Sequence, residues 1–298
     1  MISKKILLQN YDIKNISLEQ NFIELVNELK KISIPLEIKF DNYVIKYLNY
    51  GSFSNVYLAT HDDKKYIIKH IRNSILFCNN AIDDIIREIE ILSKLNHKNI
   101  IKFYGYVIEY NNIFLIFENG GIDILELYNE TQPLGFNVID MLKQISQAIY
   151  YLQKNNIIHR DIKLENIVYL DGIYKLIDFD FAININKITN DQKNRICGTP
   201  EYMPPELIKN IKINNSHWNL KSDIWCLGVC ICFLITDEII ITDNDIKKFH
   251  EKISHNKLFN KYICNKFSKE IDIFKKMLSI SVDNRITIEE LISDLEHL

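Results

Sequence analysis

The chain has 298 residues, of which 47% are hydrophobic and 25% charged, and its formal net charge is −3 at pH 7. This composition is typical of a folded globular protein and excludes intrinsic disorder. The small negative charge argues against nucleic acid or an anionic membrane surface as the main partner. No apolar run reaches the ~20 residues of a membrane span, so we expect no transmembrane helix.

The first residues and the cysteines bear on the cellular compartment. Residues 1–5 lead into only a short apolar patch, so no secretory signal peptide is expected. Cys226, Cys230 and Cys232 lie within one apolar run, where thiols usually pack as small hydrophobic groups. The paired spacing of a zinc site is missing. We therefore expect buried reduced thiols in an intracellular, cytoplasmic protein.

Residues 1–40 are predicted to form an N-terminal helical extension. Ser17 and Gln20 have the spacing of a capping box, and Pro35 is expected to end the helix. Apolar residues recur between them at helical spacing, at Phe22, Leu25, Val26, Leu29 and Ile32. We expect this stripe to pack on the back of the domain that follows. Docking into a partner's groove is the alternative.

The pattern is strand-like from residue 42 to residue 57, and a helix is predicted over Ala81–Leu95. Tyr43, Ile45 and Tyr47 alternate along a first strand, and two apolar runs flank the polar turn 61–64 as in a hairpin. Further strands are predicted over Ile100–Ile108 and Ile113–Phe117, and helices over Phe136–Gln153, Ser222–Ile235, Ser268–Met277 and Ile288–His297. Strands first and helices later predict an α+β fold with a small β-rich lobe and a larger helical lobe.

The most informative stretch is 159–166, which reads His-Arg-Asp-Ile-Lys-Leu-Glu-Asn and lies between two short apolar runs. Phosphoryl transfer needs a carboxylate for the hydroxyl proton, a cation for the moving phosphate, and an amide and a carboxylate to hold Mg²⁺. Asp161, Lys163, Asn166 and Asp178 would supply these four groups in that order. A charged surface loop is the alternative reading of so short a string.

This stretch resembles the catalytic loop of eukaryotic-type protein kinases, and Asp178-Phe179 resembles the start of their metal-binding motif. Residues 197–206, Cys-Gly-Thr-Pro-Glu-Tyr-Met-Pro-Pro-Glu, resemble the family's G-T-x-x-Y-M-A-P-E signature. The resemblance covers about residues 42–298 and implies membership of the Ser/Thr-specific branch. It implies a kinase domain over 41–298, with an N-lobe over 41–118, a hinge over 118–121 and a C-lobe over 122–298.

The resemblance also implies a nucleotide site. It assigns Lys69 to the α/β-phosphates of ATP and Glu88 to holding the Lys69 ammonium in place. The glycine-rich loop matches residues 49–56, where Gly51 remains while Asn49 and Ser54 replace glycines, so weaker nucleotide affinity is predicted. The other implied contacts are Val56 and Ile67 above the adenine, Val168 below it, Phe117 as the gate behind it, and the backbone of Glu118 to Gly120 at its edge. Asp123 would meet the ribose or a basic residue of the substrate. An exposed turn is the alternative reading of residues 115–121.

Further contacts follow from the same resemblance. Thr199 would contact Asp161 and Lys163 and favour Ser or Thr as the acceptor. Glu206 would pair with Arg285, and Asp223 would brace the backbone of the catalytic loop. Asp180 replaces the glycine of Asp-Phe-Gly, which removes backbone freedom and adds a negative charge near the metal.

Regulation by phosphorylation is predicted to be absent at the usual position. The resemblance implies an activation segment between Asp178 and Glu206. Arg160, directly before Asp161, marks the class in which a phosphate on this segment is paired by arginine. The usual acceptor position holds Arg195, preceded by Asn194, and neither side chain can accept a phosphate by the ordinary route. Thr189 lies several residues too early. We therefore expect activity that is largely independent of phosphorylation at that site.

The expected protein is an ATP- and Mg²⁺-dependent Ser/Thr protein kinase that acts on protein substrates as a monomer. A pseudokinase scaffold is the first alternative, favoured by the eroded glycine loop and by Asp180. A small-molecule phosphotransferase is the second, although it would have no use for a substrate loop over 199–206.

Overall fold

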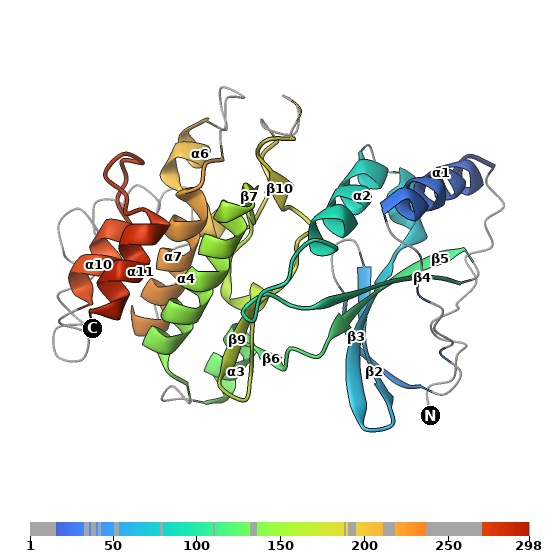
Figure 1. Ribbon diagram of the computed structural model, residues 1–298, viewed down its shortest axis with the longest axis horizontal. Helices are drawn as coiled ribbons and strands as arrows, with labels where there is room; N and C mark the ends of the chain where they lie inside the picture. The colour runs from blue at the N-terminus through green and yellow to red at the C-terminus, as the bar shows by residue number, and fades with distance from the viewer. Residues whose placement is uncertain are drawn as a thin grey trace. The chain divides into compact units, whose positions relative to one another are not determined.

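A computed structural model describes residues 16–32, 36, 40, 43–50, 54–77, 80–109, 111–131, 136–187, 189, 195–210, 218–236 and 270–297 (Figure 1). Two compact units divide the chain. The first comprises Met1–Asn96 and Ile101–Gly120, and the second comprises His97–Ile100 and Gly121–Leu298. Across the described ranges, no helix combines the length and the apolar character needed to cross a membrane.

The first unit is built on a five-stranded antiparallel sheet in the order β1-β2-β3-β5-β4. Its strands are β1 (Val44–Tyr50), β2 (Ser54–His61), β3 (Lys64–Ile71), β4 (Phe103–Glu109) and β5 (Asn112–Glu118). Asp62 and Asp63, which join β2 to β3, both take positive φ. A two-residue hairpin turn requires this conformation, and Asp tolerates it better than most residues. The predicted hairpin is therefore confirmed.

The pairing register sorts the strand residues onto two faces. Val56 pairs with Lys69, and Lys69 pairs with Leu115, so these three side chains share one face of the sheet. The neighbouring residues point the other way and form a buried core cluster of Phe40, Ile45, Tyr57, Ala59, Ile68, Val107, Phe114 and Ile116. The ring of Phe40 meets that of Phe114 edge-on, with 5.4 Å between the ring centroids.

Three helical elements complete the first unit: α1 (Ile16–Ile32), the 3-10 helix η2 (Asn73–Phe77) and α2 (Ala81–Leu92). Helix α1 begins one residue before Ser17, which was predicted to cap it. The side chain of Ser17 lies outside the described part of the structure, and so does Pro35, which was predicted to end the helix. Helix α1 packs against α2 and η2 (Figure 1). Its apolar stripe is thus covered by the unit that follows, as predicted.

Two predicted boundaries in this unit are wrong for identifiable reasons. Helix α2 ends at Leu92 instead of Leu95, because the amides of Lys94 and Leu95 bond three residues back and tighten the last turn. Strand β4 begins at Phe103 instead of Ile100. Ile100 forms an isolated parallel bridge with Leu176 and belongs to the second unit.

The second unit is mainly helical. Its helices are α3 (Ile124–Glu130), α4 (Val138–Lys154), α6 (Pro205–Asn210), α7 (Ser222–Thr236), α10 (Ile271–Met277) and α11 (Ile288–Glu296). Its short strands are β6 (Ile122–Asp123), β7 (Ile157–Ile158), β8 (Ile167–Leu170), β9 (Ile173–Leu176) and β10 (Ile183–Asn184). Together with the sheet of the first unit, these elements confirm the α+β fold class.

Helix α4 is the central element of this unit and packs against α7, α11 and β9. Asn137 accepts hydrogen bonds from the amides of Ile139 and Asp140. The first turn therefore starts after Asn137, two residues later than the predicted start at Phe136.

Helix α7 is buried along most of its length, and Cys226, Cys230 and Cys232 lie within it. All three are buried, as predicted, and form no disulfide within the part of the chain that the structure describes. Burial raises the pKa of the Cys226 and Cys230 thiols well above the ordinary value, because a thiolate loses its hydration there. Both thiols are therefore protonated and act as packing groups.

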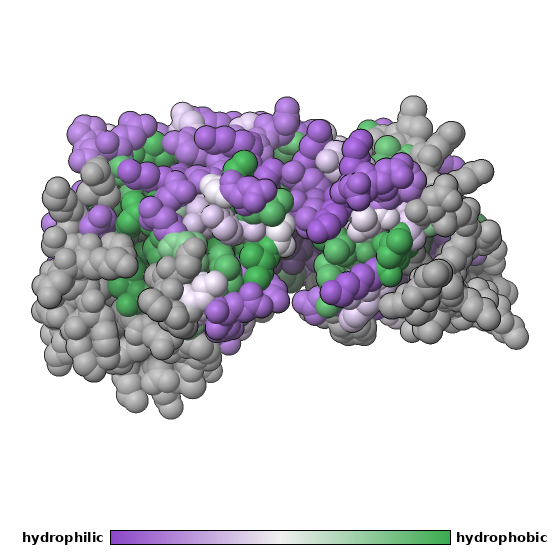
Figure 2. Space-filling view, turned by 90° about the horizontal axis from the view of Figure 1, so that it is seen from below, coloured by the Kyte–Doolittle hydropathy of each residue, from purple (hydrophilic) through white to green (hydrophobic). Residues whose placement is uncertain are grey.

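The face drawn in Figure 2 carries mainly hydrophilic residues with smaller apolar areas between them. Exposed large hydrophobic residues are found on β1 (Val44, Tyr47, Leu48) and on β8 and β9 (Leu170, Ile173). Scattered apolar side chains of this kind are normal on a folded protein.

Candidate active site

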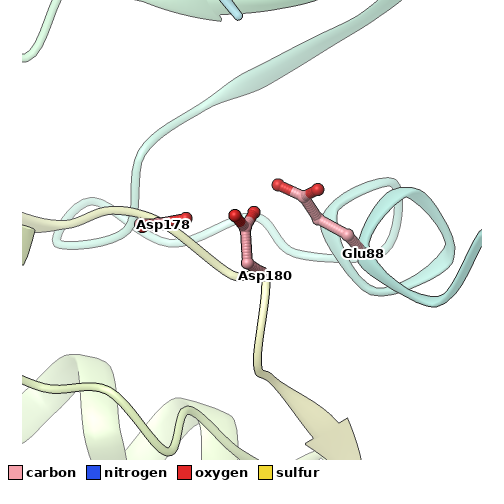
Figure 3. Close-up of side chains that lie close together, drawn as sticks. All are labelled: Glu88, Asp178 and Asp180. Carbon is pink, nitrogen blue, oxygen red and sulfur yellow. The ribbon is translucent and has the colours of Figure 1, made fainter. Parts of the chain in front are cut away.

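Lys69 and Glu88 form a buried ion pair in the first unit. The Lys69 Nζ donates to Glu88 Oε1 at 2.7 Å, and the two residues are 9% and 3% exposed. Strand β3 supplies the lysine, and helix α2 supplies the carboxylate of Glu88, which is labelled in Figure 3. A charge pair held this far from water keeps the ammonium in one position, which is the arrangement predicted from the sequence.

Three of the residues predicted to contact adenine, Val56, Ile67 and Phe117, share a face of the sheet with Lys69. Ile67 pairs with Leu58 and Phe117, and these positions alternate in step with Lys69 along β3 and β5. Ser54 is buried at the start of β2, while Asn49 is exposed on β1 next to a register irregularity. Gly51 lies outside the described residues.

Glu118 makes hydrogen bonds through both its backbone and its side chain. Its amide donates to the Lys102 carbonyl at 3.0 Å, and its Oε1 accepts from the Lys102 amide at 2.7 Å. Gly120 is buried, and the first unit ends there. This position falls inside the range 118–121 predicted as a hinge.

In the second unit, Asp223 holds the backbone of the predicted catalytic loop. Its carboxylate oxygens accept from the amides of His159 at 2.8 Å and Arg160 at 3.0 Å. Burial raises the pKa of Asp223, while the two amides and the nearby cationic groups act in the opposite direction. Arg160 takes a φ of 70°, a left-handed conformation that costs free energy and must be held by its surroundings. The bracing predicted for Asp223 is present.

Asp161, Lys163 and Thr199 form one polar cluster. Asp161 Oδ1 accepts from both the amide and the hydroxyl of Thr199 at 2.8 Å, and Lys163 Nζ donates to Thr199 Oγ1 at 3.0 Å. The Lys163 ammonium also lies 3.1 Å from Asp161 Oδ2. Burial acts to lower the pKa of Lys163, but the Asp161 carboxylate outweighs it and the pKa is raised. Lys163 is therefore a cation.

Asn166 joins this cluster to the segment that carries Asp178. The Asn166 Nδ2 donates to the backbone carbonyl of Asp161 at 2.8 Å and to Asp161 Oδ2 at 3.0 Å. The backbone carbonyl of Asn166 accepts from the amide of Ile177 at 2.9 Å, which places Asp178 one residue away. Because its amide nitrogen is committed to Asp161, the side-chain oxygen of Asn166 is the atom suited to a metal.

Asp178 and Asp180 project from the segment between β9 and β10 (Figure 3). A carboxylate oxygen of Asp178 lies within 4.8 Å of one from Asp180. Asp178 has a φ of 62°, and Phe179, fully buried between the two acids, meets the His159 ring edge-on. Carboxylate and amide oxygens are the ligands that Mg²⁺ prefers, so the donor set of Asn166 and Asp178 fits this ion.

The segment 197–206 lies directly against the catalytic loop. Gly198 has a φ of 95°, and a Cβ built on it would lie 2.4 Å from the Arg160 carbonyl oxygen. Glycine is therefore required for this close approach. Arg160 also binds the chain just after Asp178, since its Nε donates to the Phe181 carbonyl at 2.6 Å.

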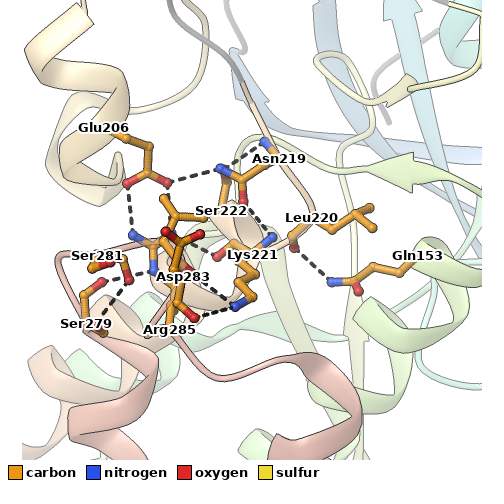
Figure 4. A network of polar contacts seen from close by, with 11 residues as sticks. Gln153, Glu206, Asn219, Leu220, Lys221, Ser222, Ser279, Ser281, Asp283 and Arg285 are labelled. Atoms are coloured by element: carbon orange, nitrogen blue, oxygen red, sulfur yellow. Dashed lines mark hydrogen bonds and ion pairs between the residues drawn. The ribbon is translucent and has the colours of Figure 1, made fainter.

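Glu206 pairs with Arg285 as predicted (Figure 4). The two guanidinium NH groups donate to the two carboxylate oxygens at 2.8 and 2.9 Å, which is a bidentate geometry. The Arg285 side chain is fully buried and lies over the Trp225 ring, 5.0 Å from its centroid. Asn219 and Lys221 complete the network around this pair.

Asp123 has a structural role that the sequence reading missed. Its carboxylate accepts from the amide of Glu126 at 2.9 Å and caps α3. The spacing of Asp123 and Glu126 is that of a capping box and could have signalled this. Val168 is buried on β8 and pairs with Asp123 on β6.

Of the residues considered for phosphorylation, Thr189 is exposed and Arg195 is partly buried. Asn194 lies outside the described residues.

The groups assigned to the nucleotide phosphates lie in the first unit, and those assigned to proton transfer and the metal lie in the second.

The sequence of the chain is similar to those of known proteins. A family model described as "Protein kinase domain" matches residues 44–295. The chain is similar to the Aurora kinase of Dictyostelium discoideum, with 31% identity over 83% of this chain and 63% of that protein. It is also similar to the Aurora kinase of Saccharomyces cerevisiae, with 34% identity over 72% of this chain and 58% of that protein. A serine/threonine-protein kinase of Dictyostelium discoideum, dst2, is 34% identical over 63% of this chain and 16% of that protein. The chain thus covers less than two thirds of the length of these relatives.

Proposed function

The chain belongs to the protein kinase family, and we propose that it transfers the γ-phosphate of ATP to Ser or Thr hydroxyls of protein substrates. The observation that carries this proposal is the cluster of Asp161, Lys163 and Thr199. A carboxylate, a cation and a hydroxyl are held there in mutual contact, on a loop braced by Asp223. The Aurora kinases and dst2 support the Ser/Thr assignment by their similarity.

We assign proton transfer to Asp161. Its carboxylate already accepts a hydrogen bond from the hydroxyl of Thr199, which supports a role in binding a hydroxyl group. A carboxylate in this position orients the attacking hydroxyl and takes its proton, an effect typically worth ~10²–10⁴-fold. Lys163 places a positive charge beside Asp161, where it can stabilise the negative charge of the transferring phosphoryl group.

Asn166 and Asp178 would hold Mg²⁺, which supplies positive charge to the phosphate oxygens when bound. Lys69 would bind the α/β-phosphates, with Glu88 fixing its position, and Val56, Ile67, Phe117 and Val168 would enclose the adenine. The backbone of Glu118 to Gly120 would contact the adenine edge.

We further propose that the kinase domain is residues 41–298, with lobes over 41–118 and 122–298 and a hinge over 118–121. The chain would act as a monomer on proteins in the cytoplasm. Asp123 would lie near the ribose, although its carboxylate also serves as the cap of α3.

The test is an assay with Mg²⁺-ATP and a basic protein substrate, comparing the natural chain with Asp161→Asn. We expect phosphate on Ser and Thr, and a loss of roughly 10²–10⁴-fold in kcat for the variant, because an amide cannot accept the proton. Asp171→Asn is the matched control, since Asp171 is an exposed acid on the β8–β9 turn.

Three results would contradict the proposal. A natural chain that binds nucleotide but transfers no phosphate would be a pseudokinase. Transfer to small molecules and not to protein would indicate the other phosphotransferase class. Equal activity of Asp161→Asn and the natural chain would show that the reaction uses a different base.

A further inference from the structure

Helix α1 lies before the residues that match the kinase family model, yet it is firmly packed in the first unit. Leu25 and Leu29 are fully buried, and Phe22 is 7% exposed. These residues recur three and four positions apart and therefore form one face of the helix. Ile23, on the other side, is 53% exposed. One face of α1 is thus committed to an intramolecular surface.

That surface is formed by α2 and η2. Among the described elements, α1 and η2 approach the backbone of α2 more extensively than any strand of the sheet does. Figure 1 shows α1 and α2 side by side. Packing against α1 is consequently a main determinant of where α2 lies.

The N-terminus of helix α2 has no side-chain cap. Asn80 occupies the cap position with a φ of 65° and makes no side-chain capping bond. A 12-residue helix without such a cap is marginal by itself, so its position depends on what packs against it.

The position of α2 determines where the Glu88 carboxylate lies. Glu88 is buried on this helix and accepts from Lys69 Nζ at 2.7 Å. A displacement of the helix by about 1 Å would lengthen this bond beyond the range of a good charge-assisted hydrogen bond. Lys69 would then lose its fixed orientation.

We propose that α1 is a positioning element for phosphoryl transfer, in which Leu25 and Leu29 hold α2 so that Glu88 keeps Lys69 oriented toward the nucleotide phosphates. The inference rests on the proposed kinase function. Leu25 and Leu29 touch no reacting group in this scheme and act entirely through Glu88.

A double-mutant cycle tests the proposal on the full chain. The variant Leu25→Ala/Leu29→Ala is made in the natural background and in a Glu88→Gln background, and kcat and KM for Mg²⁺-ATP are measured for all four proteins. If α1 acts through Glu88, the leucine changes reduce kcat/KM by about tenfold in the natural background and by less than about twofold beside Glu88→Gln. The lowering of the melting temperature should be the same in both backgrounds.

Two controls separate positioning from folding. Ile23→Ala changes an exposed residue of the same helix and should leave kcat/KM unaltered. Leu25→Met/Leu29→Met keeps the apolar volume and should restore most of the activity. If the double alanine variant does not fold, Leu29→Val alone is carried through the same cycle.

The proposal is overturned if the leucine changes reduce kcat/KM by the same factor in both backgrounds, or if they leave it unaltered. An active natural chain with either result would leave the kinase function in place and remove only the role of α1. If the natural chain is inactive, amide hydrogen exchange over residues 81–92 tests the role of α1 instead. Unchanged exchange in Leu25→Ala/Leu29→Ala would then overturn the proposal.

Discussion

Arg160 illustrates how one residue links the catalytic loop to the activation segment. It takes a left-handed φ, its amide donates to Asp223, and its Nε donates to the Phe181 carbonyl. A guanidinium at this position in the kinase family commonly pairs a phosphate. Here a backbone carbonyl takes one of its donors, and Arg195 stands where the phosphate acceptor usually lies.

We therefore predict that the chain is active without phosphorylation of the activation segment. Protein treated with a phosphatase should keep its kcat, and Thr189→Ala should change kcat by less than about twofold, within the scatter of a neutral surface substitution. Kinetic assays with intact-mass measurement check this. Protein that is inert until an upstream kinase modifies it would contradict the prediction.

The residue scale is also where the sequence was most informative. The resemblance to the kinase family predicted the pairs Lys69–Glu88, Asp161–Thr199 and Glu206–Arg285, because the family fold brings these positions together. The resemblance assigned Asp123 to a ligand and gave no sign of its capping bond, which depends only on the local spacing of Asp123 and Glu126. The position of Gly51 lies outside the described residues, so the prediction of weaker nucleotide affinity stays a prediction.

At the scale of single elements, helix starts follow from polar side chains that accept backbone amides. Asn137 starts α4, Asp123 starts α3, and Thr287 starts α11. Only local sequence is needed for such bonds, so helix starts could have been predicted more closely than periodicity alone allowed. The C-terminal end of α2 and the start of β4 could not be predicted from local sequence. They depend on hydrogen bonds in the folded chain and on which unit the chain joins.

Thr287 allows the contribution of one helix cap to stability to be measured. The Glu290 amide donates to Thr287 Oγ1 at 3.2 Å, and the Thr287 amide donates to Glu290 Oε2 at 2.8 Å, which together make a capping box. Thr287→Ala removes the accepting oxygen and should lower the free energy of unfolding by about 1 kcal/mol. Urea denaturation measures this, and Thr287→Ser is the control that keeps the cap. Equal stability of the alanine and serine variants would contradict the prediction.

At the scale of the whole molecule, contacts between distant residues fix the fold of each unit. The bond between Glu206 and Arg285 joins residues 79 positions apart, and Asp223 reaches 64 positions back to His159. Such pairs could be predicted only through resemblance to a family, since no periodicity connects them. The attachment of residues 36 and 40 to the sheet was not foreseen for the same reason.

We predict that Glu206→Gln destabilises the second unit strongly. It would leave the fully buried guanidinium of Arg285 without its counter-charge, and breaking a buried pair in this way costs about 3–5 kcal/mol. Glu90→Gln is the matched control, because the pair of Glu90 with Lys94 is exposed on a helix and contributes about 0.3–0.5 kcal/mol. Urea unfolding monitored by tryptophan fluorescence compares the two. A loss for Glu206→Gln no larger than that for Glu90→Gln would refute the prediction.

The attachment of Leu36 and Phe40 has a practical consequence for anyone who shortens this polypeptide. The Leu36 amide donates to the Tyr106 carbonyl at 2.7 Å, the Leu36 side chain lies against Gly105, and Phe40 covers Phe114. A fragment that starts where the family match starts, at residue 44, would lack both residues. The apolar surface of the sheet that they cover would then be exposed to solvent. Aggregation of such a fragment would reflect where the cut was placed, and expression should start well upstream.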